Sequence, residues 1–219
     1  MRREILAVFD LDGTLTTGVS LDRGFGKFLL EQGKLSFTPL LFYAAYFLAM
    51  MPFDPVAAVK RNKYYLRGMT ERSLKELAEV FINRYHKGLL ADHAYTLLDS
   101  HRRAGHTNVL LTGALDLVVS QLINKLDLPI DRYFATELYE ENGELSGRIR
   151  GAHYYGDTKA RLVMELASLT GADLSKSFCY ADSFSDVPML QLFGNPVAVN
   201  PDKKLAVVAR ERSWCIVYT

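Results

Sequence analysis

Two acidic motifs follow apolar runs in this 219-residue chain: residues 10–14 (DLDGT) and residues 182–186 (DSFSD). Side chains at i and i+2 of an extended segment point the same way, so Asp10 and Asp12 can face one crevice. Two like charges about 4 Å apart repel by roughly 4 kcal/mol at an effective dielectric of 20, so such a crevice needs a cation. A ligand set made of carboxylates suits Mg²⁺.

A purely structural interpretation competes with this one. Asp and Gly are common where a strand ends in a turn, and Asp186 could simply favour the start of a helix through the helix dipole. That interpretation explains either motif alone. It explains less well why two acidic pairs both stand at the carboxyl ends of apolar runs, where they would converge.

Two further polar positions fit the same crevice. Thr112 and Gly113 follow the apolar run 107–111 and offer a hydroxyl and backbone N–H groups at a strand tip. Lys159 stands at the start of a predicted helix, where a positive charge opposes the helix dipole. We therefore expect Lys159 to contact an anion or the acidic cluster.

The elements that must position these residues alternate along the chain. Apolar runs typical of buried parallel strands lie at 5–9, 107–111, 132–136, 177–181, 196–199 and 214–218. Helical segments lie between them at 114–126, 158–169, 186–193 and 203–210. Asn142-Gly143 within 137–149 predicts a β-hairpin. This pattern predicts an α/β fold, a Rossmann-like parallel sheet with helices on both faces.

A long helical stretch interrupts this alternation after the first strand. Thr70 is a predicted N-cap for a helix over 71–85, and Asp92 for one over 93–103. We expect an α/β core from 1–16 and 95–219, with an all-helical cap, 17–94, inserted after the first strand. Such an insertion lies over the carboxyl end of that strand, where open parallel sheets bind ligands.

The order DxDGT, a Thr after a strand, a Lys before a helix, then DSxSD resembles the haloacid dehalogenase superfamily of aspartate-based phosphatases, in particular its phosphoserine-phosphatase-like branch. The resemblance covers nearly the whole chain. It implies that Asp10 is the nucleophile and forms an aspartyl-phosphate. It implies that Asp12 protonates the leaving oxygen and then activates water. Thr112, Gly113 and Lys159 would hold the phosphoryl oxygens.

The resemblance also implies a Mg²⁺ site. Its ligands would be the carboxylates of Asp10 and Asp182 and the backbone carbonyl of Asp12. Asp186 would bind through water or orient the lysine. The supporting residues of both motifs are Gly13, Thr14, Ser183 and Asp186.

The chain departs from phosphoserine phosphatases at two positions. Gly13 stands where those enzymes have Ser, and Val19 stands where they carry a Glu that reads the substrate ammonium. We therefore expect a phosphomonoester hydrolase for a small phosphorylated metabolite whose identity stays open. The alternatives are a phosphotransferase that uses the same aspartyl-phosphate, and a non-catalytic binding protein on the same fold.

Composition limits the partners. Lys and Arg total 26 and Asp and Glu total 25, so the net charge of +1 disfavours nucleic acid as a partner. Two cysteines without metal spacing, and an apolar start too short for a signal peptide, indicate a cytoplasmic protein. The five histidines have no ligand spacing and are expected as surface or capping residues: His86, His93, His101, His106 and His153.

Residues 35–53 carry no charge and have three interpretations. They could pack on the core or on a second subunit of a homo-oligomer, shape a pocket for an apolar substrate, or touch a membrane. Pro39 and Pro52 leave fewer helical residues than the roughly 20 that a bilayer span needs, which disfavours a membrane partner.

Overall fold

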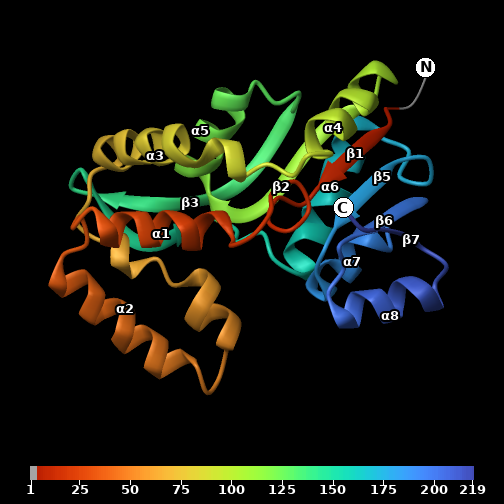
Figure 1. Ribbon diagram of the computed structural model, residues 1–219. Helices are drawn as coiled ribbons and strands as arrows, with labels where there is room; N and C mark the ends of the chain where they lie inside the picture. The colour runs from red at the N-terminus through yellow and green to blue at the C-terminus, as the bar shows by residue number, and fades with distance from the viewer. Residues whose placement is uncertain (1–3) are drawn as a thin grey trace.

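A seven-stranded sheet in the order β4-β3-β2-β1-β5-β6-β7 runs through the computed structural model, which describes residues 4–219 (Figure 1). The strands are β1 (Leu6–Phe9), β2 (Thr107–Leu115), β3 (Arg132–Glu141), β4 (Glu144–Arg150), β5 (Phe178–Ala181), β6 (Asn195–Val199) and β7 (Cys215–Val217). Neighbouring strands are parallel except β3 and β4, which form an antiparallel hairpin. The predicted α/β fold is confirmed.

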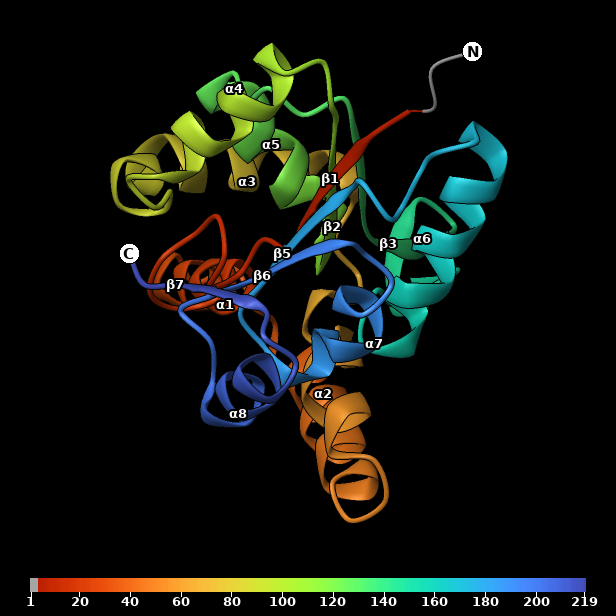
Figure 2. The same cartoon turned by 90° about the vertical axis from the view of Figure 1, so that its right-hand side faces the viewer.

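Helices cover both faces of this sheet. They are α1 (Leu21–Glu31), α2 (Phe37–Met50), α3 (Glu71–Tyr85), α4 (Ala94–Arg103), α5 (Asp116–Leu126), α6 (Asp157–Thr170), α7 (Val187–Leu190) and α8 (Lys203–Glu211). Single helical turns are η1 (Ala57–Arg61), η2 (Tyr64–Leu66), η3 (His86–Gly88) and η4 (Phe184–Asp186). Figure 2 shows α4 and α5 on one side of the strands and α6 and α7 on the other.

The central strand β1 shows why the sheet needs both layers. All four of its residues are buried. Because side chains alternate along a strand, Ala7 and Phe9 join the apolar cluster that includes α3, α4 and α5, while Leu6 and Val8 join the cluster that includes α6, α7 and α8. A strand covered on both faces is a continuous apolar run, as its sequence indicates.

Several local signals act as predicted. The Oγ1 of Thr70 accepts a hydrogen bond from the backbone N–H of Ser73 and so caps α3. Asn142 and Gly143 connect β3 to β4 with φ angles of 54° and 81°, the left-handed values that a tight hairpin turn requires.

Three local predictions need correction. Strand β2 continues to Leu115 past a shift in register after Leu111, so α5 begins two residues later than expected. Asp92 is not the N-cap of α4, because His93 occupies that position without a side-chain hydrogen bond. The helix predicted over 186–193 is only the short α7, preceded by the turn η4.

The insertion between β1 and β2 contacts the sheet through the β3–β4 hairpin. The backbone N–H of Gly68 donates to the carbonyl of Leu145, and the N–H of Leu145 donates to the carbonyl of Met69, at 3.0 and 2.8 Å. A Cβ on Gly147 would lie 2.8 Å from the Cα of Tyr64. The division into a core (1–16 and 95–219) and a cap (17–94) stays a prediction, and residues 1–3 lie outside the described residues.

Helix α2 projects from the rest of the molecule (Figure 2). None of its residues is buried, so packing on the core does not explain its uncharged sequence. Its half-buried residues recur at helical spacing along one side: Pro39, Leu40, Tyr43, Tyr46, Phe47 and Met50. Among residues 4–219, no helix has both the length and the apolar character required to cross a bilayer.

Candidate active site

The two acidic motifs meet where β1 and β5 end side by side. Asp10 follows β1, and its backbone N–H donates to the carbonyl of Tyr180 at 2.9 Å. Asp182 follows β5. Gly13 has a φ of 81°, and a Cβ there would lie 2.2 Å from Oδ2 of Asp182. Gly13 is therefore required for the first motif to turn against the second.

Lys159 joins this group from the first turn of α6. Its Nζ lies 2.6 Å from Oδ1 of Asp10 and 3.0 Å from Oδ1 of Asp186. All three side chains are at most 10% exposed. Burial alone would lower the pKa of Lys159, but the charges of the two carboxylates outweigh it and raise the pKa. The predicted contact between Lys159 and the acidic cluster is therefore present.

Three carboxylates form a cluster that can hold a metal ion. Asp10, Asp182 and Asp186 each place one oxygen so that all three lie within 4.8 Å of one another. Burial, and then the charges of Asp10 and Asp186, raise the pKa of Asp182 to about 7. Burial also raises the pKa of Asp186, against the influence of Lys159. A cluster whose members disfavour one another's charge fits a divalent cation with oxygen ligands.

The carboxylate of Asp12 points to a different partner. Its Oδ1 accepts a hydrogen bond of 2.8 Å from the backbone N–H of Leu21, at the start of α1. Burial raises the pKa of Asp12 to about 7, although that hydrogen bond opposes the change. A carboxyl group with a pKa near neutrality can both donate and accept a proton. Of the predicted metal set, Asp10 and Asp182 share the carboxylate cluster, Asp186 joins them, and the side chain of Asp12 does not.

Thr112 and Gly113 lie in the irregular part of β2, beside the acidic cluster. The hydroxyl of Thr112, which is 1% exposed, accepts a hydrogen bond from the backbone N–H of Ala114 at 3.1 Å. A Cβ on Gly113 would lie 3.0 Å from Cε1 of His153. Gly113 thus allows the close approach of His153, which a side chain at this position would obstruct.

The supporting residues separate into two groups. Ser183 lines the same cavity as the catalytic candidates, and its Oγ accepts hydrogen bonds from the backbone N–H and the hydroxyl of Ser185. Thr14 is 1% exposed and lies outside the cavity wall. Its hydroxyl has no hydrogen-bond partner among the described residues.

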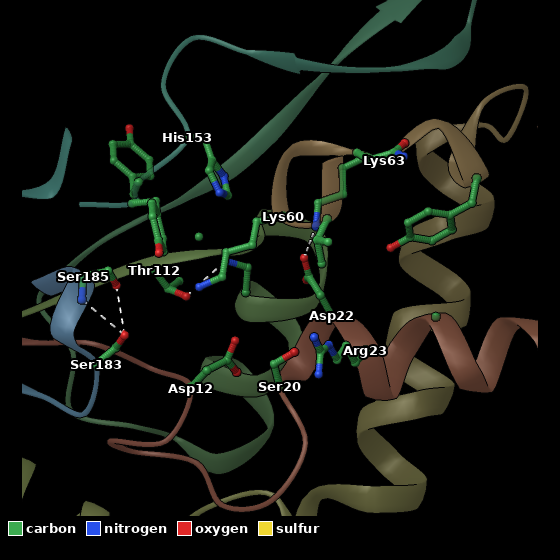
Figure 3. Close-up of a pocket in the computed structure, with 18 of the residues that line it drawn as sticks. Asp12, Ser20, Asp22, Arg23, Lys60, Lys63, Thr112, His153, Ser183 and Ser185 are labelled. Atoms are coloured by element: carbon green, nitrogen blue, oxygen red, sulfur yellow. Dashed lines mark hydrogen bonds and ion pairs between the residues drawn. The ribbon is translucent and has the colours of Figure 1, made fainter. Parts of the chain in front are cut away.

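One cavity of about 700 Å³ contains this site and extends toward the insertion. Figure 3 shows Thr112, Ser183 and Ser185 at one end and Asp22 and Arg23 at the other. The predicted residues in its wall are Asp10, Asp12, Thr112, Gly113, Lys159, Asp182, Ser183 and Asp186. The first acidic motif, the second, Thr112 and Lys159 thus come together from four separate segments.

Sequence reasoning missed an ion pair in this cavity. Lys63 is bonded to Oδ2 of Asp22, and Oδ1 of Asp22 accepts from the backbone N–H of Leu115 at 2.9 Å. The pair links the insertion to β2. Asp22 resembles any acidic residue in a first helical turn, so nothing in the sequence distinguishes it. Lys63 stands close to three other basic residues, Lys60, Arg61 and Arg67.

The expectation that the histidines are surface or capping residues is wrong for two of them. His101 is 6% exposed and His153 is 7% exposed. His101 contacts the hydroxyl of Tyr180 through Nε2 at 2.8 Å. His153 lines the cavity and contacts Oγ1 of Thr136 at 3.2 Å. Their burial depends on contacts distant in sequence, which spacing alone does not reveal.

Comparison with known proteins agrees with this geometry. The family model of haloacid dehalogenase-like hydrolases matches residues 7–191. The chain belongs to this family. It is 32% identical over 217 residues to an inhibition of morphological differentiation protein of Streptomyces azureus, covering 96% of this chain and 77% of that protein. It is 31% identical over 214 residues to a phosphoserine phosphatase of Mycobacterium tuberculosis, covering 95% and 68% of the two chains.

The fold of this family member also matches solved structures. A protein of unknown function from Bordetella pertussis Tohama I superposes with a TM-score of 0.82 at 23% sequence identity, covering 99% of both chains. At that identity the match shows the shared fold. The activity must be argued from the site itself.

Proposed function

We propose that this chain is a Mg²⁺-dependent phosphomonoester hydrolase that acts through a phosphorylated Asp10 on a small phosphorylated metabolite. One observation carries the proposal: the buried ammonium of Lys159 contacts Asp10 and Asp186 within a cluster of three carboxylates. A nucleophile fixed by a cation beside a metal-binding cluster suits phosphoryl transfer, which needs mainly positioning and charge stabilisation. The phosphatase name of the mycobacterial relative supports the same chemistry.

In the first half of the reaction, a carboxylate oxygen of Asp10 attacks phosphorus as the bond to the leaving oxygen breaks. Asp12, in its protonated form, gives its proton to that oxygen and an alcohol leaves. In the second half, Asp12 accepts a proton from water, whose oxygen attacks the same phosphorus. The bond to Asp10 then breaks, which releases phosphate and restores both carboxyl groups.

The remaining residues position the phosphoryl group. The hydroxyl of Thr112, the backbone N–H of Gly113 and the ammonium of Lys159 would donate to its oxygens. Mg²⁺ bound at Asp10 and Asp182, with the backbone carbonyl of Asp12, would offset negative charge on the phosphoryl group as phosphorus is attacked. Asp186 holds Lys159 in place through its ion pair.

The insertion over residues 17–94 would act as the cap of this site. Residues from α1, α2 and η1 line the same cavity as Asp10, which supports that role. A reducing compartment, the cytoplasm, suits its two free cysteines, of which Cys179 is buried and Cys215 exposed.

Hydrolysis of p-nitrophenyl phosphate, with and without Mg²⁺, tests the proposal. We expect metal-dependent turnover by the wild type and a loss of about a thousandfold or more in kcat for Asp10→Asn. Asp92→Asn is a matched control, because Asp92 is exposed and lies outside the cavity. If no phosphoester shows metal-dependent turnover, the binding-protein alternative is favoured.

Asp12→Asn tests the second half of the reaction. Nitrophenolate leaves without protonation, so this variant should still phosphorylate Asp10 and give a burst of nitrophenol, followed by slow turnover. Phosphate bound covalently to the protein, detected by intact-protein mass, should accompany the burst. Wild-type turnover by this variant would refute the acid–base role. If the wild-type protein loses its covalent phosphate only with an added alcohol acceptor, and the product is the phosphomonoester of that alcohol, the phosphotransferase is favoured.

A further inference from the structure

The cavity is much larger than the group on which the catalytic residues act. Its volume of about 700 Å³ corresponds to the liquid volume of roughly 20 water molecules at about 30 Å³ each. A phosphoryl group bound at Lys159 and Thr112 would fill only a small part of it. The rest of the cavity extends between α1 and α2, so it must receive the alcohol part of the substrate or remain filled with water.

The wall of that remaining part is apolar on the side of α2. Leu35, Leu40 and Tyr43 line it from α2 and the segment before it, and Tyr65 from η2. The rings of Tyr43 and Tyr65 meet edge to face, with centroids 5.8 Å apart. The side-chain amide of Asn62 donates to the backbone carbonyl of Tyr43 at 2.9 Å. These contacts hold the apolar wall in position without burying it.

Burial in the core does not account for this wall. Helix α2 has 14 residues, none of them charged and none buried. An exposed apolar surface that is continuous with a binding cavity is usually a site of contact with a ligand or partner. Because Leu40 and Tyr43 face the same cavity as Asp10, the nearest candidate for that contact is the substrate itself.

The charged groups of the wall disfavour an amino-alcohol phosphate. Beyond the four catalytic carboxylates, Asp22 is the one acidic residue among the described residues that line the cavity. Both of its oxygens are engaged, one by Lys63 and one by the backbone N–H of Leu115. The same region contains the cations Arg23 and Lys60. A substrate ammonium would find no free carboxylate there.

We propose that the substrate is a phosphomonoester of an alcohol with an extended apolar chain, which binds against Leu35, Leu40 and Tyr43 while the phosphate lies at Asp10. This inference rests on the proposed phosphatase function and adds the chemical class of the leaving alcohol. It assigns α2 the role of a specificity wall.

A series of n-alkyl monophosphates from ethyl to octyl, used below the concentration at which they form micelles, tests the inference with the Mg²⁺-loaded protein. Each methylene buried against the wall should raise kcat/KM by about fourfold. Burial of only two or three of the six additional methylenes would make octyl phosphate exceed ethyl phosphate by about thirtyfold, and the increase should end when the wall is covered. Phosphoserine should fall below octyl phosphate.

Neighbouring leucines on α2 provide a matched pair of variants. Leu40 lines the cavity, whereas Leu41 is 53% exposed and does not. Leu40→Asn should lower kcat/KM for octyl phosphate by about tenfold and for ethyl phosphate by a much smaller factor. Leu41→Asn should leave both unchanged. Circular dichroism and the unfolding midpoint of each variant establish that the fold is retained.

The outcomes separate this inference from the proposed function. A kcat/KM that does not change or falls with chain length, in a protein that hydrolyses p-nitrophenyl phosphate, would overturn the apolar substrate and leave the phosphatase standing. Preference for phosphoserine would do the same. Equal losses in Leu40→Asn and Leu41→Asn would mean that the outer face of α2, rather than the cavity, recognises the chain, and this too would overturn the inference.

Discussion

Replacing Asp182 by Asn should stabilise the metal-free protein while it abolishes activity. The carboxylate of Asp182 lies within 4.8 Å of two others, and its pKa is raised from 3.8 to about 7, first by burial and then by the charges of Asp10 and Asp186. The folded state therefore binds more protons than the unfolded state between these two values. The free energy of unfolding rises as the pH falls through this window. Above pH 7, where Asp182 is ionised, its carboxylate destabilises the folded state by the full amount.

The size of the effect follows from that pKa. One pKa unit corresponds to about 1.4 kcal/mol, so an ionised Asp182 at pH 8 costs about 4 kcal/mol of folding free energy. Because the side chain is partly exposed, solvent screening reduces the expected gain in Asp182→Asn to about 2–4 kcal/mol. The amide retains the shape of the carboxylate, so the close approach to Gly13 is unchanged.

Urea unfolding at pH 8 in the presence of EDTA measures this gain, and Asp92→Asn is the control for the same chemical change at an exposed position. The advantage of Asp182→Asn should shrink at pH 5, where the wild-type carboxyl is largely protonated. Added Mg²⁺ should stabilise the wild type and have much less effect on the variant. If Asp182→Asn is less stable than the wild type at pH 8 without metal, the claim that an ionised Asp182 destabilises the metal-free protein is refuted.

Three further perturbations test other parts of the structure. Gly13→Ala should lower kcat for p-nitrophenyl phosphate about a hundredfold or more, because its Cβ would collide with a metal-binding carboxylate. Gly18→Ala, at a similar φ with open space around it, should not. Burial, and then nearby Lys and Arg charges, lower the pKa of His153 to about 4. The free energy of unfolding should therefore be unaffected by this group above pH 6.5 and decrease by up to about 3 kcal/mol as the pH falls toward 4. His153→Asn should remove that part of the pH dependence of the urea midpoint. Gly147→Ala should lower the thermal midpoint by several degrees more than Gly143→Ala, because only the former would strike the backbone of the insertion.

Each of these predictions has a clear contrary result. Equal activities of Gly13→Ala and Gly18→Ala would show that the motif at residues 10–14 tolerates a side chain at position 13. An unchanged pH dependence without the histidine would place its titration elsewhere. Equal thermal midpoints of Gly147→Ala and Gly143→Ala would show that the contact between the hairpin and the insertion contributes little to stability.

Much of the fold could be predicted from local sequence, because the decisive signals are local. The apolar runs around Val8 and Cys179 mark buried parallel strands, Thr70 caps its helix, and Asn142-Gly143 forms the hairpin turn. The continuation of β2 to Leu115 could not be predicted, because it depends on pairing with β3 at Thr136, far along the chain.

The site shows the same division. Asp10 and Asp182 follow apolar strands, and Lys159 stands where its charge opposes a helix dipole, so each carries a local mark. Asp22 has none: its importance comes from Lys63 and from a backbone group on β2, which only the folded chain brings together.

The hydrogen bonds between Leu145 and the segment 68–69 have a mechanical consequence for substrate entry. They join part of the insertion to the sheet as if it were an additional edge, so residues 64–69 would have to break backbone pairing in order to swing outward. Helix α2 has no such attachment to a strand in the described chain. Movement of α2 away from the cavity would therefore break side-chain contacts, such as that between the rings of Tyr43 and Tyr65, but no backbone pairing with a described strand.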